Sequence, residues 1–286
     1  MTGRGAGMAP ALVAAALWGL TPVATKGALG GWSPELVSVL RLGIGATALR
    51  ALAGRGTPWL PRDRWAWLAG VVLGADFALY NYGIRFTTAA LAGLVVNVEV
   101  VSGVLFARWL LGERLGLRRL AGATLTLVGV VWVSTEGIAT SDVFARERVF
   151  GNVLVMGGAL CWSLYAVAQR RSARTGGVAR LVAPIFGAAT LVTLPGLLTP
   201  SAWVNPAGAA PTLMLLVLTG CCTVGVYLVY ARAQELLDLT VLTMVLAIIP
   251  VFAVVFAWLL LGEPLTSRLL AGGVVIAAGI AVTANG

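Results

Sequence analysis

Long apolar runs with few charges dominate this chain and leave it few ways to fold. The runs lie at 8–29, 34–53, 65–85, 88–111, 117–135, 151–172, 178–198, 211–233, 239–261 and 267–284. An α-helix of about 20 apolar residues is long enough to cross the hydrocarbon layer of a membrane. Barrel strands are shorter and alternate in polarity, which these runs do not. The sequence therefore predicts an all-α integral membrane protein with ten transmembrane helices.

Composition argues against a water-soluble protein. Only 11% of the residues are charged and the mean hydropathy is +0.94, whereas soluble domains carry about 25% charged residues. The longest expected loop, 136–150, is too short for a folded aqueous domain. Residues 1–29 begin like a signal peptide, but no small-residue cleavage site follows the apolar run, so we expect this segment to be the first helix.

The basic residues predict the orientation. With the N-terminus in the cytoplasm, 14 of the 20 Lys and Arg lie at cytoplasmic helix ends or loops. This excess agrees with the positive-inside rule and makes both termini cytoplasmic. Because the basic residues flank helices and form no single patch, the net charge of +9 indicates no nucleic-acid partner.

Enzyme chemistry has little support in the sequence. The chain contains no histidine, no phosphate-binding Walker loop and three cysteines without zinc-site spacing. We therefore expect no metal and no cofactor. An intramembrane enzyme or a membrane scaffold is a minor alternative.

An internal repeat divides the chain into two halves, expected at 1–143 and 144–286. At a shift of 150 residues, 13 of the 22 positions in 101–122 are identical to those in 251–272. Weaker matches align Trp18 with Trp162 and Tyr82 with Tyr230. Because each half has five helices, an odd number, the second half enters the membrane from the opposite side. Such inverted repeats are typical of transporters that alternate access to a central cavity.

The shared motif resembles a known family. The first half reads LLGERLGLRRLAG at 110–122 and the second reads LLGEPLTSRLLAG at 260–272. The pattern L-L-G-E, a basic residue and L-A-G, once per half, resembles the drug/metabolite transporter superfamily and its EamA-type ten-helix exporters, on the YddG-like branch of amino-acid exporters. The resemblance implies export of amino acids, other metabolites or drugs across a bacterial inner membrane. The chain departs from the family where Glu99 stands opposite Ile249, beside the expected Pro250.

Three charged residues lie at membrane depth. Asp76 and Glu99 lie near the middle of the third and fourth predicted helices, and Arg41 lies two turns into the second. Such charges are costly in a bilayer and normally face a cavity or a partner. Three roles for Glu99 remain open: binding a substrate ammonium group, carrying a proton, or pairing structurally with Arg41. Asp76 is either a structural partner or a functional group.

Aromatic side chains recur at helical spacing near these charges. Four predicted helices each carry such a stripe, and if they face one another they line a central cavity. An aromatic belt at the membrane interface is the alternative. The candidate substrate-binding residues are Trp18, Asp76, Tyr80, Tyr82, Glu99, Trp162, Tyr165, Tyr227 and Tyr230.

Together these features predict a secondary transporter that exports a small amphipathic metabolite, with amino acids favoured, including aromatic or apolar ones. Its partners are the substrate and the lipid bilayer. A proton-coupled exporter of cationic drugs is the alternative. Uniport or proton antiport, and a monomer or a larger assembly, remain open.

Two further expectations concern structure only. Glu113 and Glu263 are expected to cap or salt-bridge the short turns near Arg118 and Arg268. The glycine pairs are expected to mark close helix packing, as small residues do in membranes; they are Gly70 and Gly74, Gly122 and Gly129, and Gly272 and Gly279.

Overall fold

The computed structural model confirms the all-α prediction for the part of the chain that it describes. That part comprises residues 3–111, 116–134, 143–172, 177–203, 208–236, 245–246 and 248–284, and every regular element within it is a helix. The elements are α1 (Gly3–Ala28), α2 (Pro34–Ala53), α3 (Arg64–Phe86), α4 (Ala89–Val95), α5 (Val98–Leu111), α6 (Leu117–Ser134), α7 (Val143–Arg171), α8 (Val178–Thr193), η1 (Leu194–Leu198), η2 (Pro200–Trp203), α9 (Ala209–Thr219), η3 (Gly220–Gly225), α10 (Val226–Leu236), α12 (Ile249–Leu261) and α13 (Ser267–Ala284).

Five helical segments among these are long and apolar enough to cross a membrane. They are Gly7–Ala28, Pro34–Ala53, Arg146–Gln169, Val178–Leu198 and Ala209–Tyr230. Two shorter apolar segments, Ile249–Leu261 and Ser267–Thr283, accompany them. The structure therefore supports a helical membrane protein, while the full set of ten crossings stays a prediction.

The predicted continuous helix over 88–111 is wrong. α4 ends at Val95 and α5 begins at Val98. At the break, Asn97 Nδ2 donates to Gly93 O at 2.9 Å and to Leu94 O at 3.0 Å. The Asn97 side chain thus forms hydrogen bonds with carbonyl groups at the end of α4, and such side-chain bonds favour a break in the helix. In the second half α12 begins at Ile249 with Pro250 in its first turn, where the missing N–H of proline costs little.

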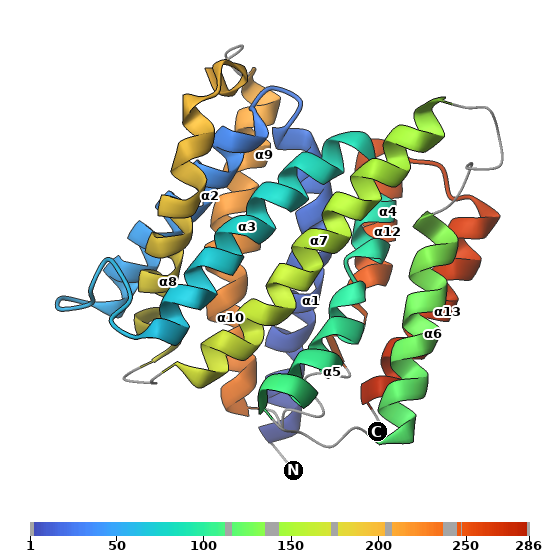
Figure 1. The fold of residues 1–286 in the computed structure, drawn as a ribbon, viewed down its shortest axis with the longest axis horizontal. Helices are drawn as coiled ribbons and strands as arrows, with labels where there is room; N and C mark the ends of the chain where they lie inside the picture. Colours follow the sequence, from blue (N-terminus) through green and yellow to red (C-terminus); the bar gives the residue numbers. More distant parts are fainter. Residues whose placement is uncertain are drawn as a thin grey trace.

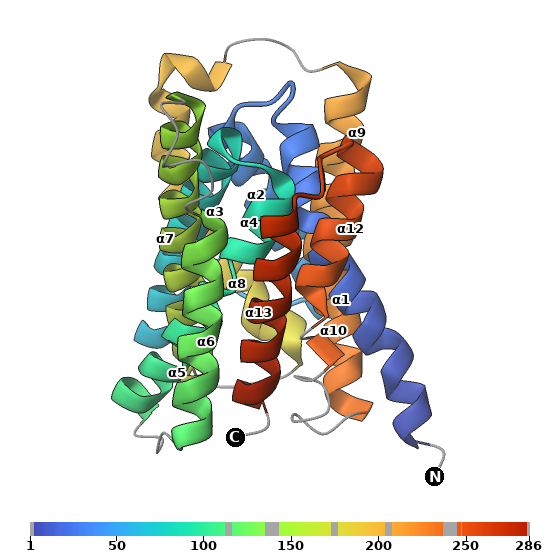
Figure 2. The same cartoon turned by 90° about the vertical axis from the view of Figure 1, so that its right-hand side faces the viewer.

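Two pairs of helices define the two sides of the bundle. α6 and α13 lie together on one side, α2 and α8 lie together on the other, and α1, α3, α7 and α10 lie between them (Figure 1). α1 begins and α13 ends at the same end of the bundle (Figure 2). Below, this end is called the terminal end and the other the distal end.

The α6–α13 pair runs antiparallel. Gly122 near the start of α6 faces Gly279 near the end of α13, whose carbonyl oxygen lies 2.7 Å from where a β-carbon of residue 122 would stand. Val133 near the end of α6 packs on Gly272 near the start of α13. The four glycines singled out by the repeat therefore do mark close helix packing, and they do so between the corresponding helices of the two halves.

The α2–α8 pair shows the same geometry. Gly45 lies against Phe186, and Gly43, which is nearer the start of α2, lies against Thr190, which is nearer the end of α8. These two helices also occupy corresponding places in the predicted repeat. Antiparallel packing of these helices is compatible with the predicted inverted repeat, which stays a prediction.

The first prediction concerns the α6–α13 contact. We expect Gly122→Ala to lower the free energy of unfolding by about 1–3 kcal/mol, because the added methyl group meets backbone atoms of Thr283 and Gly279 that cannot move aside. Denaturant unfolding of the purified protein in detergent measures the change.

Gly103→Ala on α5 is the matched control. A β-carbon there has no neighbour within 4 Å, and alanine favours a helix over glycine by about 1 kcal/mol, so no loss is expected. Equal stability of Gly122→Ala and the wild type would contradict the antiparallel contact.

Candidate functional site

A buried arginine on α2 lies at the centre of the first polar cluster. Arg41 is 7% exposed, and its Nε donates to Thr223 Oγ1 at 2.6 Å. Its Nη2 donates to Cys222 O at 3.4 Å, and its guanidinium carbon lies 4.4 Å from the centre of the Phe77 ring. A buried charge is stable in a membrane protein only with such partners. Arg41 thereby links α2 to α3 and η3.

The partners of Arg41 lie on a π-helical turn. η3 spans Gly220–Gly225, and within it Thr223 Oγ1 donates to Leu218 O, five residues earlier, at 2.9 Å. Widened turns of this kind are frequent at functional sites because they change the backbone pairing locally. Here the Cys222 carbonyl accepts from Arg41 as well.

Asp76 lies close to this arginine without touching it. Asp76 is 9% exposed and interacts electrostatically with Arg41, which attracts it, and with Glu99, which repels it. Its Oδ1 packs on Gly158 of α7, 2.9 Å from the position of a β-carbon there. Within the described ranges, no ion pair closer than 4.0 Å joins Arg41 to Asp76 or Glu99. If Asp76 pairs structurally with Arg41, the pairing is therefore an electrostatic attraction over a distance and not a direct salt bridge.

Glu99 lies in the first turn of α5, directly after the break. A carboxylate is favoured there because the helix N-terminus carries partial positive charge. Its backbone carbonyl accepts from Ser163 Oγ of α7 at 3.0 Å, which anchors the turn. Ser102 Oγ and Ser163 Oγ are themselves 2.7 Å apart. The break thus places Glu99 at the start of a helix that is held against α7.

Five of the predicted aromatic residues converge in one packed cluster, which we call the aromatic cluster: Trp18, Trp162, Tyr165, Tyr227 and Tyr230. The ring centres of Trp18 and Tyr230 are 5.1 Å apart, and those of Trp162 and Tyr165 are 5.0 Å apart. The Tyr165 and Tyr227 hydroxyl oxygens are 3.5 Å apart. Contacts of this geometry stabilise by about 0.5–1.5 kcal/mol each. α1, α7 and α10 supply the five side chains.

The two remaining tyrosines lie apart from this cluster. Tyr80 packs in a neighbouring core group with Ile84 and Leu94. Tyr82 is 38% exposed, and its hydroxyl group donates to Glu35. Residues two apart on a helix point in different directions, since each residue turns the helix by about 100°. This explains why two tyrosines so close in sequence do not share one site.

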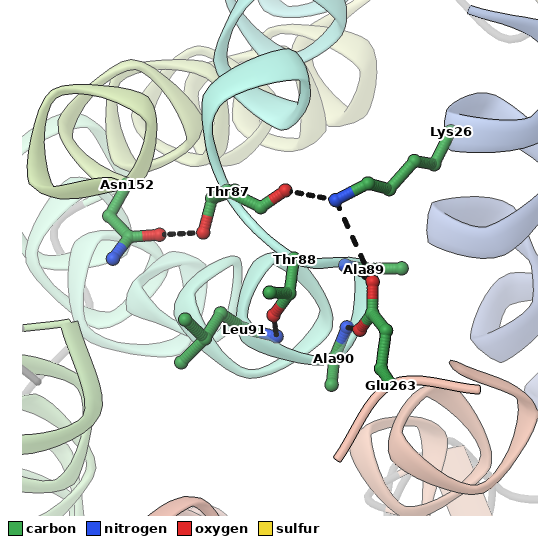
Figure 3. A network of polar contacts seen from close by, with 8 residues as sticks. All are labelled: Lys26, Thr87, Thr88, Ala89, Ala90, Leu91, Asn152 and Glu263. Atoms are coloured by element: carbon green, nitrogen blue, oxygen red, sulfur yellow. Dashed lines mark hydrogen bonds and ion pairs between the residues drawn. The ribbon is translucent and has the colours of Figure 1, made fainter. Parts of the chain in front are cut away.

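A second polar cluster lies at the distal end (Figure 3). Glu263 Oε1 accepts from Ala89 N at 2.7 Å, and Oε2 accepts from Ala90 N at 2.8 Å. Lys26 Nζ lies 3.6 Å from Glu263 Oε1 and donates to Thr87 O. Thr87 Oγ1 in turn donates to Asn152 Oδ1 at 2.6 Å. We call this set of contacts the Glu263 latch.

The latch satisfies the start of a broken helix. The first N–H groups of a helix lack partners within it. At α4, Thr88 Oγ1 accepts from Leu91 N at 3.1 Å, and Glu263 takes the N–H groups of Ala89 and Ala90. Glu263 belongs to the second half of the chain, whereas Lys26 and α4 belong to the first. The latch therefore ties the halves together at one end.

The structural role predicted for Glu263 is confirmed, but Glu263 caps the start of α4 and pairs with Lys26, and not with the turn near Arg268. Glu263 pairs with Lys26 and α4, whereas Arg268 Nε donates to Trp132 O at 2.8 Å. Arg268 lies on the far side of the turn, next to the end of α6. The corresponding Glu113 falls in 112–115, outside the residues that the structure describes.

Comparison with known proteins identifies the family. The sequence profile of the EamA-like transporter family matches residues 5–135 and again residues 149–285. The chain belongs to the EamA-like transporter family. The resemblance to the drug/metabolite transporter superfamily is thereby confirmed. This EamA-family protein is a membrane transporter and not an enzyme.

Relatives of this EamA-family chain carry transporter names. It is 29% identical to an uncharacterized transporter of Archaeoglobus fulgidus over 231 residues, 80% of this chain and 77% of the relative. It is 35% identical to the aromatic amino acid exporter YddG of Ancylobacter novellus over 163 residues, 55% of this chain and 56% of that protein. A crystal structure of a protein 25% identical superposes with a TM-score of 0.70, covering 98% of this chain and 96% of that one.

Some polar contacts of this EamA-family protein have only weak signals in the sequence. A basic residue inside a predicted membrane helix marks Arg41, but nothing marks its partners Thr223 and Cys222, about 180 residues away. Lys26 and Asn152 look like ordinary residues of helix ends. Their roles depend on contacts between distant segments.

The second prediction tests the Glu263 latch in a double-mutant cycle. We expect Lys26→Met and Glu263→Gln each to lower the free energy of unfolding by about 1–3 kcal/mol, because each leaves a partly buried polar partner unsatisfied. The double variant should lose less than the sum, with a coupling of about 0.5–3 kcal/mol. Denaturant unfolding in detergent measures all four proteins.

Glu147→Gln on an exposed turn of α7 is the matched control. It removes the same charge and should change stability by no more than about 0.5 kcal/mol. Additive effects of the two latch substitutions would contradict a direct contact between Lys26 and Glu263.

Proposed function

We propose that this EamA-family transporter exports amino acids, including aromatic and apolar ones, and that the aromatic cluster contacts the apolar part of the substrate. The observation that carries the proposal is the convergence of five aromatic side chains from α1, α7 and α10. Aromatic faces bind apolar and aromatic groups through stacking and burial. The name of the Ancylobacter novellus relative, an aromatic amino acid exporter, supports this choice of substrate.

Charge favours an amino acid over a cationic drug. An amino acid carries both an ammonium and a carboxylate group. The polar cluster next to Phe77 offers both signs of charge: Arg41 is attracted to Asp76, and the carboxylates of Asp76 and Glu99 repel each other. In this proposal Glu99 and Asp76 attract the ammonium group and Arg41 attracts the carboxylate. A lipophilic cation is attracted by the same carboxylates but has no group that matches Arg41, whereas an amino acid matches both signs of charge.

For the topology we propose ten crossings in two inverted halves, 1–143 and 144–286, with both termini in the cytoplasm of a bacterial inner membrane. The antiparallel α6–α13 and α2–α8 pairs and the two family matches support this arrangement. The common end of α1 and α13 is consistent with an even number of crossings (Figure 2). The distal end then faces the periplasm.

For the mechanism we propose alternating access, with the Glu263 latch closing the distal end. The latch joins α4 and α1 of the first half to the α12–α13 turn of the second (Figure 3). Outward release of a substrate requires these segments to separate. α3, α4, α10 and α12 would then move together, with the breaks at Asn97 and Ile249 as the points where they bend.

The third prediction is preload-dependent counterflow of phenylalanine. Proteoliposomes loaded with unlabelled phenylalanine should take up radiolabelled phenylalanine without an ion gradient. Trp162→Ala should lower the uptake at least tenfold, because it removes a face of the aromatic cluster. Trp258→Ala on α12, a tryptophan that is 51% exposed, is the control and should retain uptake.

Either of two results would contradict the proposal. Equal loss in both variants would show that any lost tryptophan disables the protein. No counterflow of amino acids, together with movement of a lipophilic cation driven by a pH gradient, would favour the proton-coupled drug exporter.

The fourth prediction concerns opening of the latch. In a Lys26→Cys, Glu263→Cys variant, a bifunctional thiol reagent should join the two positions and stop counterflow, and a reductant should restore it. Each single variant and the wild type, treated with the same reagent, report any effect at the native cysteines. Full transport by the cross-linked double variant would show that this end need not open.

A further inference from the structure

A cavity separate from the aromatic cluster lies at the distal end, between α2, α3 and the η1 turn. Its volume is about 150 Å³. Glu35, Ser38, Tyr82, Thr193 and Thr199 supply its polar lining. Among them only Glu35 is charged, and although it lines the cavity it is just 7% exposed.

The two oxygens of the Glu35 carboxylate have different surroundings. Oε1 accepts from the Tyr82 hydroxyl group and lies 3.5 Å from Thr199 Oγ1 and 3.4 Å from Ser201 Oγ. Oε2 is buried and has no hydrogen-bond partner within the described ranges. Buried polar atoms of native proteins normally have partners, and leaving one unsatisfied is costly. This carboxylate therefore keeps an acceptor that has no partner inside the protein.

The charge of Glu35 is also unmatched nearby. Its hydrogen-bond partners are all neutral: the hydroxyl groups of Tyr82, Thr199, Ser201 and Ser33, and its own backbone N–H. The ion pair found within the described ranges is the one between Lys26 and Glu263. A ligand that fits here carries positive charge and donates hydrogen bonds.

The size of the cavity indicates a small organic molecule. A single water needs about 10–15 Å³ measured in the same way, so about 150 Å³ is roughly ten times larger than a water or a bare ion requires. Pro34, Ala78 and Val192 form apolar walls beside the carboxylate. An ammonium head with a short apolar tail satisfies both features, since a primary ammonium offers three donors.

We propose that this cavity binds primary ammonium compounds with a short apolar tail, and that the Glu35 carboxylate pairs with their ammonium group. The site does not depend on the substrate that passes the aromatic cluster. In the proposed orientation it is reached from the periplasm.

Glu35 also has a structural reading that the experiment must separate. Glu35 lies in the first turn of α2, where a carboxylate is favoured, and through Thr199 and Ser201 it holds the η1–η2 segment. If this tether is its whole role, the loss of the Tyr82 contact and the loss of the carboxylate should change ethylammonium binding in the same direction.

The test is calorimetric titration of the full-length protein in detergent with ethylammonium chloride. We expect saturable binding of ethylammonium and none of ethanol, which lacks the charge, or of tetrabutylammonium, whose four butyl arms do not fit the cavity. Glu35→Gln should weaken binding at least tenfold. Tyr82→Phe should bind at least as tightly as the wild type, because it removes a donor from the carboxylate and keeps the ring.

Two controls separate this site from the rest of the protein. Glu147→Gln removes an exposed carboxylate and should leave binding unchanged. Trp162→Ala should also bind ethylammonium normally, so failure of the aromatic cluster in transport and failure of this site are distinguishable. Equal weakening in Glu35→Gln and Tyr82→Phe, or ethylammonium heats equal to those of ethanol, would overturn the proposal.

A labelling measurement keeps the proposal testable if Glu35→Gln does not fold. In Thr199→Cys, with the native carboxylate intact, ethylammonium should slow the reaction of the new cysteine with a methanethiosulfonate reagent at least threefold. Mass spectrometry of separate peptides distinguishes it from Cys161, Cys221 and Cys222. An unchanged rate would overturn the proposal.

Discussion

Hydrocarbon offers no hydrogen-bond partner, so each break in a membrane helix must be compensated by groups of the protein itself. The break between α4 and α5 shows how this chain does so. The start of α4 is satisfied by Thr88 and by Glu263, which is 174 residues away from Ala89. At the break itself, Asn97 Nδ2 donates to the carbonyls of Gly93 and Leu94 at the end of α4. The helix is thus interrupted here while its end groups keep partners within the protein.

The same requirement links the two halves of the chain. Glu263 of the second half binds α4 and Lys26 of the first, and Arg41 of the first half binds Thr223 and Cys222 of the second. Further polar contacts also join the halves, among them Ser163 with the Glu99 carbonyl and Arg268 with the Trp132 carbonyl, whereas small residues make the close contact between α6 and α13. Close-packed small residues fix the distance between helices, whereas the polar contacts can form or break as units. In the proposed alternating access, these polar contacts are therefore the points at which we expect the halves to separate.

The sequence predicts features that follow from composition and repetition. Apolar runs predict the helices, and the repeat predicts which glycines mark close contacts, because both signals are local or recur in the chain. The aromatic cluster was also predictable, since Trp162 and Tyr165 lie on one face of a helix and Trp18 corresponds to Trp162 in the repeat. What hydropathy does not reveal is a break inside an apolar run, as at Asn97, because one polar residue barely lowers the average of its window.

Partners from distant segments are the second feature that the sequence leaves undetermined. Glu263 was expected to cap or salt-bridge the nearby turn at Arg268, yet Arg268 donates to the Trp132 carbonyl and Glu263 pairs with Lys26 of a distant helix. Tyr80 and Tyr82 show the same limit on a smaller scale. Their helix is correctly predicted, but which of them faces a given neighbour depends on the packing of α2 and α7 around it.

The two proposed sites differ chiefly in whether a cation accompanies the carboxylates. Arg41 lies within electrostatic reach of Asp76, so a ligand there meets both signs of charge and a zwitterion is matched at both ends. Glu35 has only neutral hydroxyl partners, so a ligand there gains from an ammonium group and loses from a carboxylate. Because Coulomb interactions are strong where water is scarce, this single difference is enough to give the two sites different ligands in one transporter.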